Sequence, residues 1–207
     1  MSKNDLTEDE KNERHKFKMA KRKELQQKRV AAADREKGLL IVYTGNGKGK
    51  STAAFGTVVR ACGQGMQVGI MQFIKGTWAT GEQAALKRFD DLITYRVMGE
   101  GFTWDTQDRQ RDIAACRAAW EVVKTMLADE RYSLIVLDEL NIALRYDYLP
   151  IEEVVEVLNA RREGLHVLVT GRNAKPELID AADLVTEMTL VKHPFQQGIK
   201  AQKGIEF

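Results

Sequence analysis

The sequence predicts an α/β protein built on a mainly parallel sheet. From Gly38 onward, short apolar runs alternate with amphipathic stretches, which is typical of parallel strands covered by helices. A glycine-rich stretch follows the first apolar run, and an acidic pair follows the fourth. The chain has 207 residues, of which 43% are hydrophobic, so it can bury one core of ordinary size. We therefore expect an N-terminal arm over residues 1–37 and one α/β domain over residues 38–207.

The arm differs from the domain in charge. Residues 1–37 hold 12 Lys and Arg against 8 Asp and Glu, and because the whole chain is +2, the remaining residues sum to −2. Residues 16–37 are rich in helix formers and contain no Gly or Pro, but their apolar positions form only a narrow stripe. Two interpretations remain open at this point. The arm is either a solvated tail or a helix that docks on a partner surface or closes over a site.

Six apolar runs predict the strands of the sheet, and they cover residues 38–45, 67–75, 94–99, 133–140, 166–172 and 184–191. Two helices are marked most clearly. Residues 106–129 repeat apolar side chains at helical spacing (Ile113, Cys116, Trp120, Val123 and Leu127), and this stripe is expected to be core. Residues 151–162 follow Pro150, which suits the start of a helix.

Residues 43–52, YTGNGKGKST, have the arrangement of a P-loop, because they join the first strand to a helix expected from Thr52 to Cys62. Glycines let backbone N–H groups surround phosphate oxygens, and the helix adds its positive N-terminal end. The general pattern has a glycine where this chain has Thr44, so the loop is a variant with an extra glycine at position 45. The predicted nucleotide-binding residues are Gly45, Asn46, Gly47, Lys48, Gly49, Lys50, Ser51 and Thr52.

An acidic pair, Asp138 and Glu139, follows the apolar run of residues 134–137 at the carboxyl end of a strand. Parallel sheets place their ligands at this edge, so the two carboxylates are expected opposite the Ser51 hydroxyl. Together the three side chains suit Mg²⁺ and its water shell. A helix N-cap followed by an acid is the alternative interpretation. Thr170 and Arg172 end another strand at the same edge.

The remaining reactive side chains carry weaker signals. Cys62 and Cys116 have no CxxC spacing and are expected to be reduced, packed thiols. His166 begins a strand and is expected to be structural, whereas the role of His193 stays open. No apolar run approaches the ~20 residues that span a bilayer, and the N-terminus lacks the apolar centre of a signal peptide, so we expect a cytoplasmic protein without a membrane partner.

These patterns predict binding of a magnesium–nucleotide complex, but they do not decide which bond breaks. An ATPase or a small-molecule kinase attacks the γ-phosphorus, whereas an alkyl transferase releases all three phosphates together. A nucleic-acid binder that uses the basic arm is a third class. The near-neutral domain argues against it.

Several stretches together resemble the P-loop corrinoid adenosyltransferases, the cob(I)yrinic acid a,c-diamide and cob(I)alamin adenosyltransferases of adenosylcobalamin biosynthesis and salvage. The resemblance covers residues 38–207 in order and is most specific in MGEGFTWDTQD and in the C-terminal KAQKGIEF; its other stretches include GNGKGKST, GIMQFIKGTW, VLDELNIALRYDYLP and VTGRNAKPELIDAADLVTEM.

The resemblance implies a RecA-like fold and a reaction in which a Co(I) corrinoid attacks the 5′ carbon of ATP and intact triphosphate departs. It implies that Lys50 acts on the leaving group, that Ser51 and Glu139, with Asp138, serve Mg²⁺, and that Phe102 and Trp104 face the corrin. On spacing alone, the two aromatic residues would equally well be core. It further implies a homodimer whose N-terminal helix covers the partner's corrin site, and an electron donor such as a reduced flavoprotein.

Overall fold

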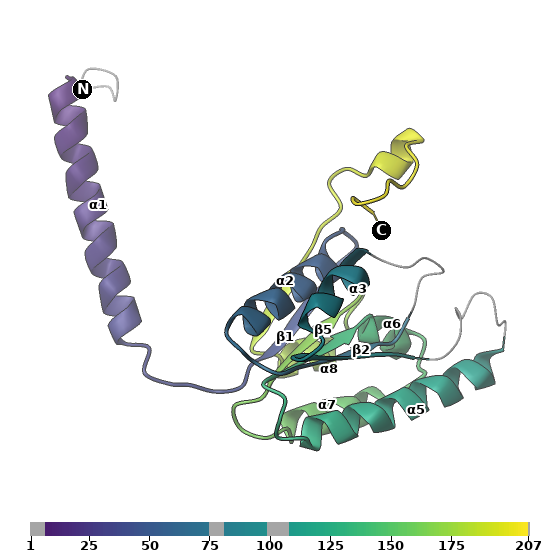
Figure 1. The fold of residues 1–207 in the computed structure, drawn as a ribbon. Helices are drawn as coiled ribbons and strands as arrows, with labels where there is room; N and C mark the ends of the chain where they lie inside the picture. Colours follow the sequence, from purple (N-terminus) through teal and green to yellow (C-terminus); the bar gives the residue numbers. More distant parts are fainter. Residues whose placement is uncertain (1–6, 75–80, 99–107, 207) are drawn as a thin grey trace. The chain divides into compact units, whose positions relative to one another are not determined.

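The computed structural model describes residues 7–74, 81–98 and 108–206 (Figure 1). The chain divides into two compact units between Glu36 and Lys37, one residue before the boundary expected from the sequence. Lys37 falls in the second unit, where its Nζ lies 2.5 Å from Asp183 Oδ1. Each unit is described by itself.

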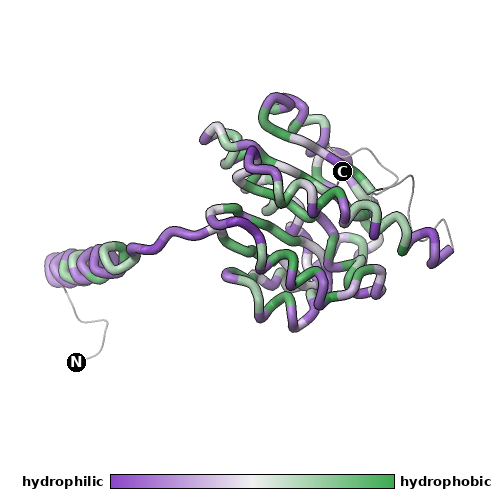
Figure 2. Tube along the Cα trace, turned by 90° about the horizontal axis from the view of Figure 1, so that it is seen from below, coloured by the Kyte–Doolittle hydropathy of each residue, from purple (hydrophilic) through white to green (hydrophobic). Residues whose placement is uncertain are grey.

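In the described part of the first unit, residues 7–36, the chain forms one helix, α1 (Glu8–Ala31). Its start is fixed by a capping box in which Thr7 accepts a hydrogen bond from the Glu10 amide and Glu10 accepts one from the Thr7 amide. None of its residues is buried, and Phe17 is 71% exposed. The trace is mostly hydrophilic with a few apolar interruptions (Figure 2). The helix therefore carries apolar side chains that its own unit does not bury.

The second unit is built on a six-stranded sheet in which every pairing is parallel, as the sequence predicted. The strand order is β3-β2-β4-β5-β1-β6. The strands are β1 (Leu40–Thr44), β2 (Val68–Gln72), β3 (Ile93–Val97), β4 (Leu134–Asp138), β5 (His166–Thr170) and β6 (Leu184–Glu187). Because β5 lies between β1 and β4, the loop after β1 and the acids after β4 are two strands apart at one edge.

Helices cover both faces of the sheet (Figure 1). Each face of the sheet carries its own cluster of buried hydrophobic side chains. The side chains of β4 alternate between the two: Leu134 and Val136 belong to the cluster on the first face, and Ile135 and Leu137 belong to the cluster on the second face. The first face is covered by α2 (Lys50–Gly63) and α3 (Gly81–Leu86), and the second by α5 (Arg109–Ala128), α6 (Leu140–Arg145), α7 (Ile151–Asn159) and α8 (Pro176–Ala181).

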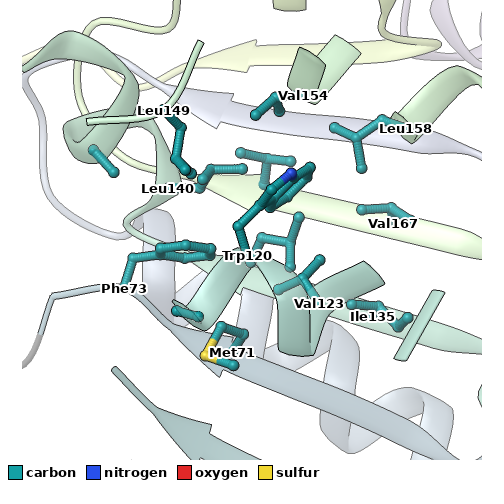
Figure 3. Close-up of a cluster of buried hydrophobic side chains, with 14 of the residues drawn as sticks. Met71, Phe73, Trp120, Val123, Ile135, Leu140, Leu149, Val154, Leu158 and Val167 are labelled. Carbon is teal, nitrogen blue, oxygen red and sulfur yellow. The ribbon is translucent and has the colours of Figure 1, made fainter. Parts of the chain in front are cut away.

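Trp120 of α5 lies at the centre of the second cluster, among aliphatic side chains from the sheet, α6 and α7 (Figure 3). Cys116, Val123 and Leu127 are buried beside it, which confirms that this helical stripe is core, and Ile113 packs at its margin. The Trp120 indole Nε1 donates to Glu153 Oε1 at 3.1 Å, so the polar atom of this large side chain is satisfied.

The elements differ from the predicted ones mainly at their ends. The strand expected to reach residue 140 ends at Asp138, because Glu139 turns into the left-handed region at φ 60° and α6 begins directly after it. The strand expected to reach residue 191 ends at Glu187. Short elements escaped prediction because fewer than two turns show no periodicity: α3, α6, α8 and the 3₁₀ turns η1 (Lys87–Phe89) and η2 (Pro194–Gln197).

Candidate nucleotide-binding site

A cavity of about 400 Å³ lies at the carboxyl edge of the sheet, between the loop after β1 and the acids after β4. Its lining includes loop residues 47–52, Asp138, Glu139 and Arg172. The structure therefore brings together most of the residues that the sequence assigned to one site. Gly45 and Asn46 belong to the same loop but do not line the cavity.

The loop conformation explains the irregular glycine pattern. Gly45 has φ 94°, and a Cβ built on it would lie 2.4 Å from the Met188 carbonyl oxygen, so no other residue fits there. The preceding Thr44 ends β1, and its hydroxyl accepts a hydrogen bond from the Ala174 amide at 3.0 Å. Gly49 has φ 103° and immediately precedes α2. Gly45 therefore lies where only glycine fits, and the preceding Thr44 is paired with β6 and bonded to the segment after β5.

Lys50 is buried, with its side chain turned back over the loop: its Nζ donates to the Gly47 carbonyl oxygen at 2.6 Å. Burial lowers the pKa of the Lys50 ammonium, and the nearby Glu139 carboxylate opposes that shift. The Gly47 amide donates to Met188 O at 2.6 Å. A cation held inside a loop of backbone amides is the arrangement that binds the phosphates of a nucleotide.

The two acids of the pair are in different environments. Asp138 is 1% exposed and accepts hydrogen bonds at both oxygens, from Thr170 Oγ1 at 2.7 Å and from Gln72 Nε2 at 3.0 Å. Glu139 Oε2 is buried and has no hydrogen-bond partner. Burial, followed by the Asp138 charge, raises the pKa of Glu139 to about 7, although Lys50 and Arg172 oppose the shift. Glu139 therefore differs from Asp138: it lines the cavity, and one of its carboxylate oxygens is buried without a hydrogen-bond donor.

This arrangement fits a magnesium ion. Glu139, which has a buried carboxylate oxygen without a hydrogen-bond partner, and Ser51 line one cavity, and their side chains offer oxygen ligands of the kind that Mg²⁺ prefers. Within the described parts of the chain, no group of three or more His, Cys, Asp or Glu side chains gathers as a metal cluster. An ion held by few protein oxygens and by the phosphates of its nucleotide is the usual magnesium arrangement in such sites.

The structure adds residues that the sequence did not assign to the site. Ile205 and Glu206, near the C-terminal end, line the cavity, and Glu206 forms an ion pair with Lys48. Their only sequence signal was the resemblance of the C-terminal KAQKGIEF to the family. Gln72, a lone polar residue at the end of the apolar β2, contacts Asp138 from the neighbouring strand. The signal that could have identified Gln72 is its position, since it is a polar residue at the end of an otherwise apolar, buried strand.

Several expectations concern residues away from the cavity or outside the described ranges. His166 Nδ1 accepts from the Leu39 amide at 3.1 Å, which supports its structural assignment, and His193 caps the 3₁₀ turn η2. Cys62 and Cys116 are free and buried, as expected. Phe102 and Trp104 lie outside the described residues. No helix in the described ranges is both long and apolar enough to cross a membrane.

Comparisons with known proteins agree over nearly the whole chain. Residues 36–207 match the family model "ATP:corrinoid adenosyltransferase BtuR/CobO/CobP", and residues 2–30 match "Cob(I)alamin adenosyltransferase N terminal". The chain is 56% identical to a corrinoid adenosyltransferase of Pseudomonas aeruginosa over 96% of its own length and 98% of the relative's. It is 49% identical to a corrinoid adenosyltransferase of Escherichia coli (strain K12) over 94% of its length and 98% of the relative's.

Proposed function

Because the chain belongs to the ATP:corrinoid adenosyltransferase family, we propose that it moves the 5′-deoxyadenosyl group of ATP to the Co(I) centre of cob(I)yrinic acid a,c-diamide or cob(I)alamin and releases intact triphosphate. The observation that carries this proposal is the family match, which covers both units of the chain. The reaction would serve the synthesis or salvage of adenosylcobalamin in the cytoplasm.

The cavity supports the phosphate side of this reaction. When Co(I) attacks C5′, its electron pair forms the Co–C bond and the C5′–O bond breaks, so the triphosphate leaves with an added negative charge. Lys50 and the rest of loop residues 47–52 line the cavity where that charge would develop, and a fixed polar site stabilises a developing charge better than water does. Ser51 and Glu139 would hold a magnesium ion, which would supply further positive charge. The phosphate in this P-loop is then the leaving group and is not itself attacked.

The remaining parts of the proposal rest on the family resemblance. Phe102 and Trp104 face the corrin and keep water from the cobalt, which favours reduction to Co(I). The electrons come from a donor such as a reduced flavoprotein. Two chains form a homodimer, and the N-terminal helix of each covers the corrin site of the other.

One assay tests the reaction against its alternatives. The protein is incubated with Mg-ATP and chemically reduced cobalamin, and the mixture is analysed for a light-sensitive Co–C product and for triphosphate. We expect both in equal amounts, with neither formed when the corrinoid is omitted. Inorganic phosphate released without a corrinoid product would instead identify an ATPase, and transfer of the γ-phosphoryl group would identify a kinase.

Deletion of residues 1–36 tests the role of α1 while keeping Lys37 and its ion pair with Asp183. The helix exposes Phe17 and Val30, which a corrin ring or the partner chain would cover. We expect KM for the corrinoid to rise about tenfold or more and KM for ATP to change less than about twofold, because the cavity is built from the second unit alone. Equal changes in both constants, or none, would show that the arm is a solvated tail.

A further inference from the structure

Thr170 occupies the central position at the carboxyl edge of the sheet. It is the last residue of β5, the strand that separates the P-loop strand β1 from the acidic strand β4 (Figure 1). The side chain is fully buried, at 0% exposure. A buried hydroxyl must satisfy its hydrogen bonds within the protein, so its partners reveal what it holds in place.

The Thr170 hydroxyl makes two hydrogen bonds, both to the acidic pair. It donates to Asp138 Oδ1 at 2.7 Å and accepts from the Glu139 amide at 2.9 Å. Gln72 occupies the other Asp138 oxygen from the opposite side. Asp138 therefore has its two oxygens committed to neighbouring strands, and it fixes the orientation of the Thr170 hydroxyl. That hydroxyl in turn fixes the backbone of Glu139.

Glu139 needs such support because its backbone is in the left-handed region, at φ 60° and ψ 21°. A side chain with a Cβ rarely adopts this conformation, and it persists only where neighbours impose it. A second clamp acts beside the first: Asn141 Nδ2 donates to the Gly171 carbonyl oxygen at 3.0 Å. In this conformation the residue Glu139 lines the cavity, and its Oε2 is buried without a hydrogen-bond partner. An unpartnered oxygen held in a strained position indicates that it is kept for a ligand.

We propose that Thr170 is a positioning residue, whose hydroxyl holds Glu139 in its left-handed conformation so that the carboxylate meets the metal of the bound nucleotide. Asp138 acts through Thr170 and does not contact the metal. This inference rests on the proposed function only in taking Mg-ATP as the ligand; it requires nothing of the corrinoid reaction. It replaces the sequence-based expectation that both acids contact the ion.

Thr170→Val and Thr170→Ser form the matched pair that tests this role, because valine keeps the shape and loses the hydroxyl, whereas serine keeps the hydroxyl. The readout is Mn²⁺ bound in the presence of ATP, followed by electron paramagnetic resonance, with no corrinoid present. We expect Thr170→Val to weaken Mn²⁺ binding about tenfold, the usual effect of losing a residue that orients a metal ligand. Thr170→Ser should stay within about twofold of the wild type. ATP binding in EDTA should be unchanged in both.

Three results would overturn the proposal. Thr170→Val could bind Mn²⁺ as the wild type does, the serine variant could be impaired as much as the valine variant, or metal-free ATP binding could fall as much as Mn²⁺ binding, which would indicate a purely structural role. Glu139→Gln serves as the reference, and it must lose Mn²⁺ binding. If it does not, the metal site is wrong, while the corrinoid assay can still succeed.

Asp138→Asn in the wild-type and Thr170→Val backgrounds completes the design as a double-mutant cycle. If Asp138 acts through Thr170, Asp138→Asn in the Thr170→Val background should weaken Mn²⁺ binding by less than about a further twofold. The hydrogen bond between the two side chains has already been removed by Thr170→Val. If Asp138 is itself a metal ligand, the two losses multiply, and the proposal fails. The cycle is informative even if each single variant loses some stability, because it compares differences.

Discussion

Lys50→Ala should reduce adenosyl transfer by about three orders of magnitude or more and leave the protein folded. Removal of one group that stabilises developing charge in a dry site typically costs 10²–10³-fold, and here the same group also binds the ground-state phosphates. The variant should fold because the only described hydrogen bond of the ammonium is the one to Gly47 O, which contributes roughly 1 kcal/mol. Burial lowers the pKa of Lys50, which means that burying its charge costs free energy. Alanine removes that cost, and this offsets part of the lost hydrogen bond.

Lys48→Ala is the matched control, because Lys48 lies in the same loop but is exposed and paired with Glu206. Lys48 also lines the cavity, but its ammonium is exposed and already paired with Glu206, so we expect its loss to cost no more than about tenfold in turnover. Single-turnover formation of the Co–C product and the melting temperature are measured on the wild type, Lys50→Ala and Lys48→Ala. Comparable losses in the two variants would show that the loop needs only positive charge and that Lys50 has no special position.

The sequence was sufficient for the sheet because the four inner strands are mainly apolar runs, whereas the two edge strands, β3 and β6, are less apolar but still carry β-branched residues. It was also sufficient for the P-loop, since glycine, lysine and hydroxyl residues at fixed spacing leave few alternatives. It failed at Glu139, where an apparent strand continuation is a left-handed turn that starts α6. Local propensity disfavours that conformation for glutamate, so tertiary contacts such as the hydrogen bond with Thr170 must impose it.

Contacts over long sequence separations account for the other omissions. Glu206 reaches Lys48 across more than 150 positions, and Gln72 reaches Asp138 from the neighbouring strand. Neither pair leaves a spacing pattern in the sequence, because their proximity depends on strand order and on the path of the C-terminal segment. The role of Asp138 was ambiguous for the same reason. Two adjacent acids look equivalent until their hydrogen bonds are known.

Glu139 gives the protein a pH-dependent stability whose direction follows from its raised pKa. The ordinary value is 4.5 and the folded value is about 7, so between these pH values the folded protein binds more protons than the unfolded chain. Stability therefore falls as pH rises from about 4.5 to about 7, and above pH 7 the whole penalty is present. Asp138 contributes to the penalty, and Lys50 and Arg172 reduce it. Allowing for the partial exposure of Glu139, the penalty is roughly 2 kcal/mol.

Glu139→Gln should therefore abolish most activity and make the ligand-free protein more stable at pH 8. Glutamine keeps the size of the side chain and removes the charge, so the melting temperature at pH 8 should rise by roughly 5 °C, whereas at pH 5 the two proteins should melt within about 1 °C of each other. Turnover should fall by about 10²-fold or more through loss of the magnesium ligand.

Glu152→Gln, at an exposed position of α7, is the control and should change neither the melting temperature nor the turnover. The measurement is thermal unfolding without ATP or metal across pH 5–8, paired with the corrinoid assay. A gain in stability that is independent of pH would refute the buried-charge explanation. If the variant were instead less stable than the wild type at every pH, the Glu139 carboxylate would be a structural group. A carboxylate kept for a ligand has the opposite effect, because it lowers the stability of the ligand-free protein.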